Sequence, residues 1–289
     1  MDTTKPVKIR VGGVPEHFNV LWHYALEKGY FKEAGIELEW TDYPSGSSPL
    51  ARDMDTDVID IAVILTESII ASISNGNHSR IISWYVKSPL IWGIHTGANS
   101  NLQSVDDMAG KKYAVSRLGS GSHLMALVDA ENRGLTIHDD QFVIANNLSG
   151  AVDVLTNNTA DLFFWEKFTT KPKVDDGSFR RIGECPTPWP CFVIASSTKF
   201  IDEHSDILQK FLDVIHQTAH EFRSLPDATS IISKRYGLQL ADVEEWYKAL
   251  IWSEDSKIDE NEIKTIIERL KRLNVITEEK SVEEIIYKV

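Results

Sequence analysis

The stretch Gly119-Ser-Gly-Ser-His123 contains residue types well suited to holding a small ligand. Glycines let the backbone approach a ligand closely, and a helix that begins here would present free N–H groups and a partial positive charge. Arg117 offers a bidentate fork for a carboxylate, sulfonate or phosphate. The same residues would also make a helix N-cap with nothing bound, so both interpretations stay open. The stretch is not a P-loop, because no Gly-Lys-Ser/Thr follows.

Further candidate residues follow the predicted strands of the chain. Ligands of open parallel sheets bind beyond the carboxyl ends of the strands, where loops and helix N-termini converge. The hydroxyls, amides, carboxylates and aromatic rings found there are the groups that orient and cover a small ligand. The predicted ligand-binding residues are Glu16, His17, Phe18, Asn19, Trp22, Ser45, Ser47, Ser48, Thr66, Glu67, Arg117, Ser120, Ser122, His123, Trp165 and Glu166.

Several of these residues have an ordinary structural alternative. His17 and His123 are general-base candidates by type, but the sequence offers no nucleophile motif and no acid pair at a defined spacing. Glu67 and Glu166 either pair with a ligand amine or favour the first turn of a helix through its dipole. Trp22 has the spacing of a core residue as well as the chemistry of a ligand platform. We therefore predict no catalytic residue, no metal site and no cofactor.

Alternating strands and helices must position these residues. Near-continuous apolar runs such as 58–64 are typical of strands covered on both faces, which predicts an α/β fold with mostly parallel sheets. Gly29 is expected to end a helix, Thr66 to cap one, and Ser104 with Asp107 to form a capping box. Strands are predicted at 8–11, 36–40, 58–64, 81–86, 90–94, 112–116, 141–145, 161–165 and 192–195. From about 205 the predicted structure is helical to the end.

Composition excludes some partners. The 289 residues include 43 Asp and Glu against 30 Lys and Arg, a net charge of −13, so no basic face for nucleic acid is expected. No apolar run approaches the roughly 20 residues that span a bilayer, so no membrane insertion is expected. The N-terminus lacks the basic and apolar regions of a signal peptide, which predicts either a cytoplasmic protein, the favoured alternative, or a chain from which a leader has been removed.

Four segments resemble the type II periplasmic-binding-protein superfamily. They are Gly13–Asn19, Glu27–Leu38, Asp60–Glu67 and Gly119–His123. Within it the chain is most similar to the aliphatic sulfonate, taurine and nitrate binding group and its thiamine-pyrimidine-synthase-like relatives. The resemblance implies two α/β lobes with a helical C-terminal region, joined by crossings near Thr96 and Pro190. Lobe 1 would comprise 1–96 and 191–289, and lobe 2 would comprise 97–190.

The resemblance also implies that the lobes close over a small molecule, either a sulfonate-like anion or a pyrimidine-like metabolite. The missing export signal places a membrane-transporter partner in doubt. The short cysteine-rich run of the synthases is absent, since Cys185 and Cys191 are the only cysteines. The alternative is a cytoplasmic enzyme on the same fold, acting on a pyrimidine, vitamin-precursor or sulfur compound. In it His17 or His123 would act with Glu67 or Glu166, with a cofactor such as pyridoxal phosphate at the Gly-Ser-Gly-Ser turn.

Overall fold

A computed structural model describes residues 5–289 and separates into two compact units. The first unit contains the chain up to Ser88 together with Trp189–Val289, and the second contains Pro89–Pro188. Residues 1–4, which are part of the segment behind the signal-peptide prediction, lie outside the described residues. Within residues 5–289 every helix is too short or too polar to span a membrane.

The first unit is built on a five-stranded sheet of order β2-β1-β3-β10-β4. Its strands are β1 (Val7–Gly13), β2 (Ile36–Asp42), β3 (Ile61–Leu65), β4 (Ser79–Val86) and β10 (Phe192–Ser197). The strands β2, β1 and β3 are parallel, and β10 runs antiparallel to both of its neighbours. The carboxyl ends of β1, β2 and β3 therefore lie at the same edge of this sheet.

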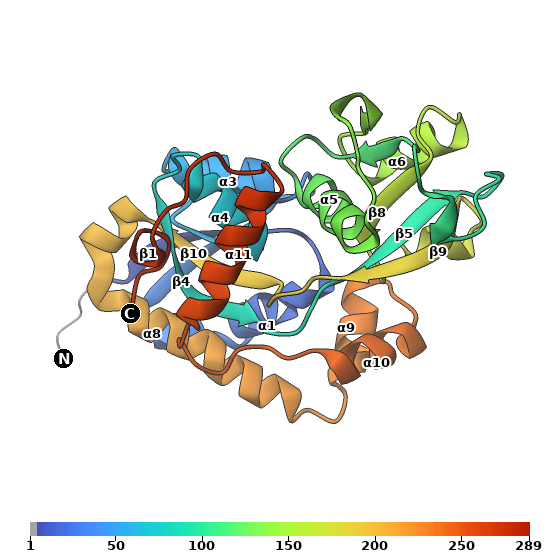
Figure 1. Ribbon diagram of the computed structural model, residues 1–289. Helices are drawn as coiled ribbons and strands as arrows, with labels where there is room; N and C mark the ends of the chain where they lie inside the picture. Colours follow the sequence, from blue (N-terminus) through green and yellow to red (C-terminus); the bar gives the residue numbers. More distant parts are fainter. Residues whose placement is uncertain (1–4) are drawn as a thin grey trace. The chain divides into compact units, whose positions relative to one another are not determined.

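The first unit also contains helices and short turns, several of which pack on this sheet (Figure 1). They are η1 (His17–Asn19), α1 (Val20–Lys28), α2 (Tyr30–Glu33), α3 (Ser47–Asp55), α4 (Thr66–Ser74), α8 (Thr198–Arg223), α9 (Ala228–Tyr236), α10 (Leu240–Ala249), α11 (Glu260–Arg272) and α12 (Val282–Ile285). The long helix α8 packs along α1, and α11 packs against α4. Of the C-terminal helices, α8 and α12 also pack on strands of the first sheet.

The second unit repeats the plan with a sheet of order β7-β6-β8-β5-β9. Its strands are β5 (Ile91–Gly97), β6 (Tyr113–Val115), β7 (Phe142–Ile144), β8 (Leu162–Glu166) and β9 (Phe179–Pro186). Its helices and turns are η2 (Val105–Asp107), α5 (Gly121–Arg133), η3 (Asp139–Gln141), α6 (Leu148–Thr156) and α7 (Lys171–Asp175). The strands β7, β6 and β8 are parallel, so their carboxyl ends also share one edge.

The α/β prediction is confirmed. In each sheet four of the five strands run in the same direction, and the sheets are mixed because β10 and β5 each pair antiparallel with two neighbours. The strand predicted at 90–94 corresponds to β5 (Ile91–Gly97), which pairs with β8 and β9 in the second unit. The two compact units divide after Ser88 and before Trp189, and the predicted crossings were near Thr96 and Pro190.

Local predictions succeeded where one residue type decides the conformation. Gly29 ends α1 with φ of 80°, and Ser104 with Asp107 forms the predicted capping box, although around a 3-10 turn. The prediction that Thr66 caps α4 was wrong. Leu65 occupies the N-cap position of α4, while the Thr66 hydroxyl donates to the carbonyl of Pro190 at 2.6 Å.

Candidate functional site

The structure gathers the predicted residues of the first unit at one sheet edge. Residues 16–19 follow β1, residues 45–48 follow β2, and residues 66–67 follow β3, and these three strands are parallel. In the second unit, 117–123 follows β6 and 165–166 ends β8, again on parallel neighbours. Each unit therefore presents polar groups at the carboxyl ends of its strands, where α/β sheets bind ligands.

Two of the aromatic candidates belong to the core of the first unit. Trp22 is fully buried among other aromatic rings, and stacks against Phe31 with 6.0 Å between ring centroids. Phe18 packs against Phe192 and Trp246 at 5.1 Å in each case. For Trp22, the structure favours the core role that its helical spacing left open.

His17 is also held inside this cluster. Its ring lies 4.2 Å from that of Trp246, and the side chain is buried. Burial lowers the pKa of His17 to about 3, because water no longer stabilises the imidazolium. A ring that stays neutral at physiological pH and packs against aromatic neighbours is a poor proton shuttle.

Asn19 and Glu67 are buried polar residues at this edge, and each has an acceptor oxygen without a partner among the described residues. The Asn19 amide Nδ2 donates to the Val14 carbonyl at 2.7 Å, whereas Oδ1 has no partner. The Glu67 Oε2 accepts from the Trp189 indole Nε1 at 2.8 Å, whereas Oε1 has no partner. Burial raises the pKa of the Glu67 carboxyl to about 7.

The remaining candidates of the first unit are less enclosed. Glu16 is half-buried at the N-cap of η1. Ser45 is exposed, Ser48 is half-buried, and Ser47 is buried in the first turn of α3. The N-cap residue of α3 is Gly46, which has no side chain that could cap the helix.

The Gly-Ser-Gly-Ser turn forms the predicted start of α5. Ser120 is the N-cap, and its hydroxyl accepts from the His123 N–H at 3.4 Å. The Ser122 hydroxyl accepts from the Ser116 N–H at 3.0 Å and lies 3.0 Å from the Ser120 hydroxyl. Both hydroxyls thus serve the turn itself, which supports the capping interpretation that the sequence left open.

His123 and Arg117 flank this turn. The His123 Nδ1 accepts from the Gly119 N–H at 3.1 Å, its ring lies 4.5 Å from that of Phe142, and burial lowers its pKa. Arg117 is half-buried in the loop that precedes the helix. His123 therefore acts as a neutral hydrogen-bond acceptor within the turn. Arg117 provides a positive charge in the loop before it.

Trp165 and Glu166 end β8 in the second unit. The Trp165 ring is half-exposed and stacks on Phe163 with 5.3 Å between centroids. The buried Glu166 Oε2 accepts from the backbone N–H groups of Phe168 at 3.0 Å and Thr169 at 2.6 Å, and burial raises its pKa. Glu166 thus differs from Glu67, because one of its carboxyl oxygens accepts two hydrogen bonds from the backbone of the following turn.

Sequence reasoning missed Trp189, which orients Glu67. This tryptophan lies between Pro188 and Pro190 just before β10, and its side chain is buried. The guanidinium of Arg269, on α11, lies 5.8 Å from the centre of its ring. A tryptophan between two prolines was the available signal, since a rigid loop fixes the position of a large ring.

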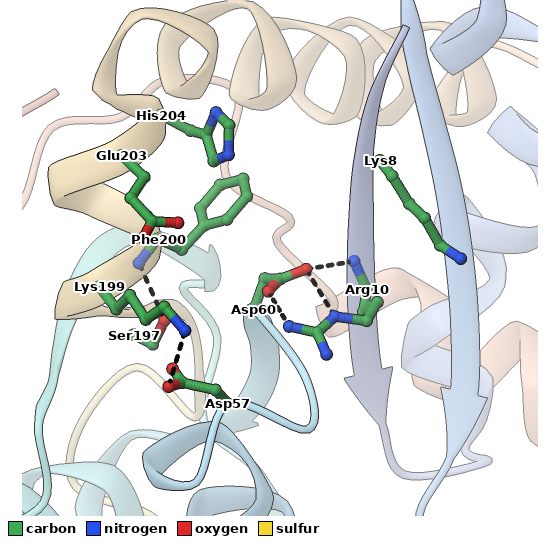
Figure 2. A pocket seen from close by; sticks show the side chains of 9 residues that line it. All are labelled: Lys8, Arg10, Asp57, Asp60, Ser197, Lys199, Phe200, Glu203 and His204. Carbon is green, nitrogen blue, oxygen red and sulfur yellow. Dashed lines mark hydrogen bonds and ion pairs between the residues drawn. The ribbon is translucent and has the colours of Figure 1, made fainter.

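A cavity of about 220 Å³ lies at the opposite edge of the first sheet (Figure 2). It is lined by the start of β1, the loop before β3 and the first turns of α8. Arg10 donates to Asp60 through Nη2 at 2.5 Å and Nε at 3.1 Å, and Lys199 lies 3.2 Å from Asp57. Because these cations are paired with acids of the same wall, the cavity presents little uncompensated charge to a ligand.

Comparison with known proteins identifies the fold family. A family model described as Ca3427-like PBP matches residues 92–185. The Candida albicans CA3427 gene product, described as having the generic periplasmic binding protein fold, is 29% identical. The superposition has a TM-score of 0.90 and covers 98% of this chain and 96% of that chain. The chain therefore has the periplasmic-binding-protein fold, and it is similar to proteins of the type II superfamily.

Other proteins similar to this chain are less so in sequence. The alkanesulfonate-binding protein SsuA of Xanthomonas axonopodis pv. citri, solved with MOPS, superposes with a TM-score of 0.83 at 17% identity, covering 99% of this chain and 100% of that chain. A protein of Bacillus subtilis (strain 168), named for binding aliphatic sulfonates, is 26% identical over 200 residues. That alignment covers 67% of this chain and 59% of the relative. The resemblance seen in the sequence is thereby confirmed for the fold family.

Proposed function

We propose that this protein binds one small organic molecule at the carboxyl ends of its parallel strands. The observation that carries the proposal is the whole-length similarity to proteins of the periplasmic-binding-protein fold, among them sulfonate-binding proteins. The buried acceptors of Asn19 and Glu67 support it locally, because they lie at the edge where α/β sheets bind ligands. The ligand class is an aliphatic sulfonate or a pyrimidine-like metabolite, and the remaining candidate residues are its proposed surroundings.

A thermal-shift screen over alkanesulfonates, nitrate and aminopyrimidines tests this proposal. A ligand at about 100 times its Kd adds about 2.7 kcal/mol to the free energy of unfolding, so at least one class should raise the melting temperature. Glu67→Ala should abolish the shift. Asp60→Asn, a change at the opposite edge of the same sheet, should retain it. Failure of every compound to raise the melting temperature would exclude these ligand classes.

An enzyme on the same fold is the second candidate function, and it has weaker support. Both histidines proposed as bases are packed or used as acceptors, with pKa values lowered by burial. Recovery of each bound compound unchanged after prolonged incubation distinguishes a binding protein from an enzyme. The cytoplasmic location, the closure of the lobes and the relation to a transporter stay predictions of the sequence.

A further inference from the structure

Glu67 is a buried carboxyl group whose hydrogen bonding is incomplete among the described residues. Its side chain is fully buried in the first turn of α4, directly after the buried strand β3. The Trp189 N–H satisfies Oε2, and Oε1 has no hydrogen-bond partner among residues 5–289. An unpaired charged acceptor away from water costs several kcal/mol, so the carboxyl must either take up a proton or meet a donor from outside the protein.

The surroundings do not supply a compensating cation. Burial is the largest cause of the raised pKa of Glu67, and its own backbone N–H and the Trp189 indole only partly oppose it. No charged side chain of the described residues contributes to that shift. The guanidinium of Arg269 lies 5.8 Å from the centre of the Trp189 ring. The buried carboxyl is therefore stabilised either by a proton or by a donor of the bound molecule.

Asn19 points to the same ligand chemistry from the neighbouring strand. Its Nδ2 donates to the Val14 carbonyl, which fixes the orientation of the amide and leaves Oδ1 as an acceptor without a partner. Asn19 follows β1 and Glu67 follows β3, and these strands are parallel neighbours. An oxyanion such as a plain sulfonate has only acceptors to offer, so it complements neither oxygen.

We propose that the ligand presents an N–H donor to Glu67, either an ammonium group or the amino group of a heteroaromatic ring. This inference rests on the proposed binding function of the same edge and selects within its ligand classes. Molecules that carry only acceptors at this end are discriminated against, because they leave both oxygens unpaired and oppose a buried carboxylate.

Matched ligand pairs test the inference by isothermal titration calorimetry at pH 8 and pH 6. The pairs are 2-aminoethanesulfonate with ethanesulfonate, and 4-aminopyrimidine with pyrimidine. In the wild-type protein at pH 8, the amine member of at least one pair should bind about tenfold or more tightly, the factor expected of one charge-assisted hydrogen bond. Its affinity should fall at pH 6, where more of the Glu67 carboxyl is protonated.

Glu67→Gln supplies the matched variant, since it keeps the shape of the side chain and removes its charge. The preference for the amine member should shrink severalfold in this variant and persist in Asp60→Asn. Equal binding of both members by the wild type, or an unchanged preference in Glu67→Gln, would overturn the inference and leave the binding function intact. If neither these compounds nor any other of the wider screen binds, the proposed function itself fails and the inference falls with it.

Discussion

Single buried side chains decide how the predicted site residues behave. Glu67 and Glu166 look alike in the sequence, because each follows a buried strand. In the structure Glu166 accepts two backbone N–H groups, while Glu67 keeps a free oxygen beside Trp189. The difference comes from the turn after each residue, which returns its N–H groups to one carboxyl and not to the other. Residue type alone cannot separate a satisfied carboxyl from an unsatisfied one.

The raised pKa of Glu67 predicts a pH dependence of stability in the ligand-free protein. A carboxyl whose folded pKa lies above its ordinary value destabilises the folded state progressively as pH rises from about 4.5 to about 7. Glu67→Gln should therefore gain stability over the wild type across this range, by at most about 3 kcal/mol at about 1.4 kcal/mol per pKa unit. Urea unfolding at several pH values measures this difference.

The comparison of the two proteins isolates Glu67 from other titrating groups. Burial lowers the pKa values of His17 and His95 to about 3 and that of His216 to about 4, so acid destabilises the fold through all three. Both proteins share these histidines, and their contribution cancels in the difference. Parallel stability curves for wild type and variant would show that Glu67 ionises normally.

At the scale of elements, helices and strands with a strong periodic pattern of apolar residues were predicted correctly. A strand whose position depends on pairing with a distant strand was missed. The buried strand β3 and the helix α5 were predicted from their patterns. The strand β9 was missed because Phe179–Pro186 carries charged residues and a proline, and it forms an edge of the second sheet. An edge strand needs no apolar pattern on both faces, so its sequence resembles that of a loop.

Close packing of α6 on the end of β7 predicts a sensitive glycine. A Cβ added at Gly150 would lie 1.9 Å from the Ala145 carbonyl oxygen, a backbone atom that cannot move aside cheaply. Gly150→Ala should destabilise the protein by about 2 kcal/mol or more, although alanine is the better helix former by about 1 kcal/mol. Chemical denaturation measures the change. The exposed neighbour provides the control, and a Ser149→Ala protein should unfold like the wild type.

At the scale of the whole molecule, one unit is continuous in sequence and the other is not. All five strands of the second unit pair within Pro89–Pro188, around a core that includes Phe163 and Phe179. The first unit takes β10 from the far part of the chain and inserts it between β3 and β4. Its sheet therefore cannot form until the chain has passed through the second unit.

This asymmetry predicts different behaviour of the two fragments. Residues 89–188 expressed alone should fold and unfold cooperatively in urea, because their sheet and core are complete. Residues 1–88 alone should not, since the sheet would lack its strand between β3 and β4. Circular dichroism during urea titration distinguishes the two. Absence of a cooperative transition in 89–188 would contradict the division into self-contained units.

The sequence by itself determined the α/β class, most element positions, the helix ends at Gly29 and Ser120, and the fold family. These features follow from the spacing of apolar residues and from the backbone preferences of single residues, both of which depend on only a few neighbouring positions. Only the tertiary structure decided the antiparallel insertion of β10 and β5, the core position of Trp22 and the pairing of Glu67 with Trp189. Those features depend on contacts between residues far apart in the chain, and burial there sets which polar atoms remain without a partner.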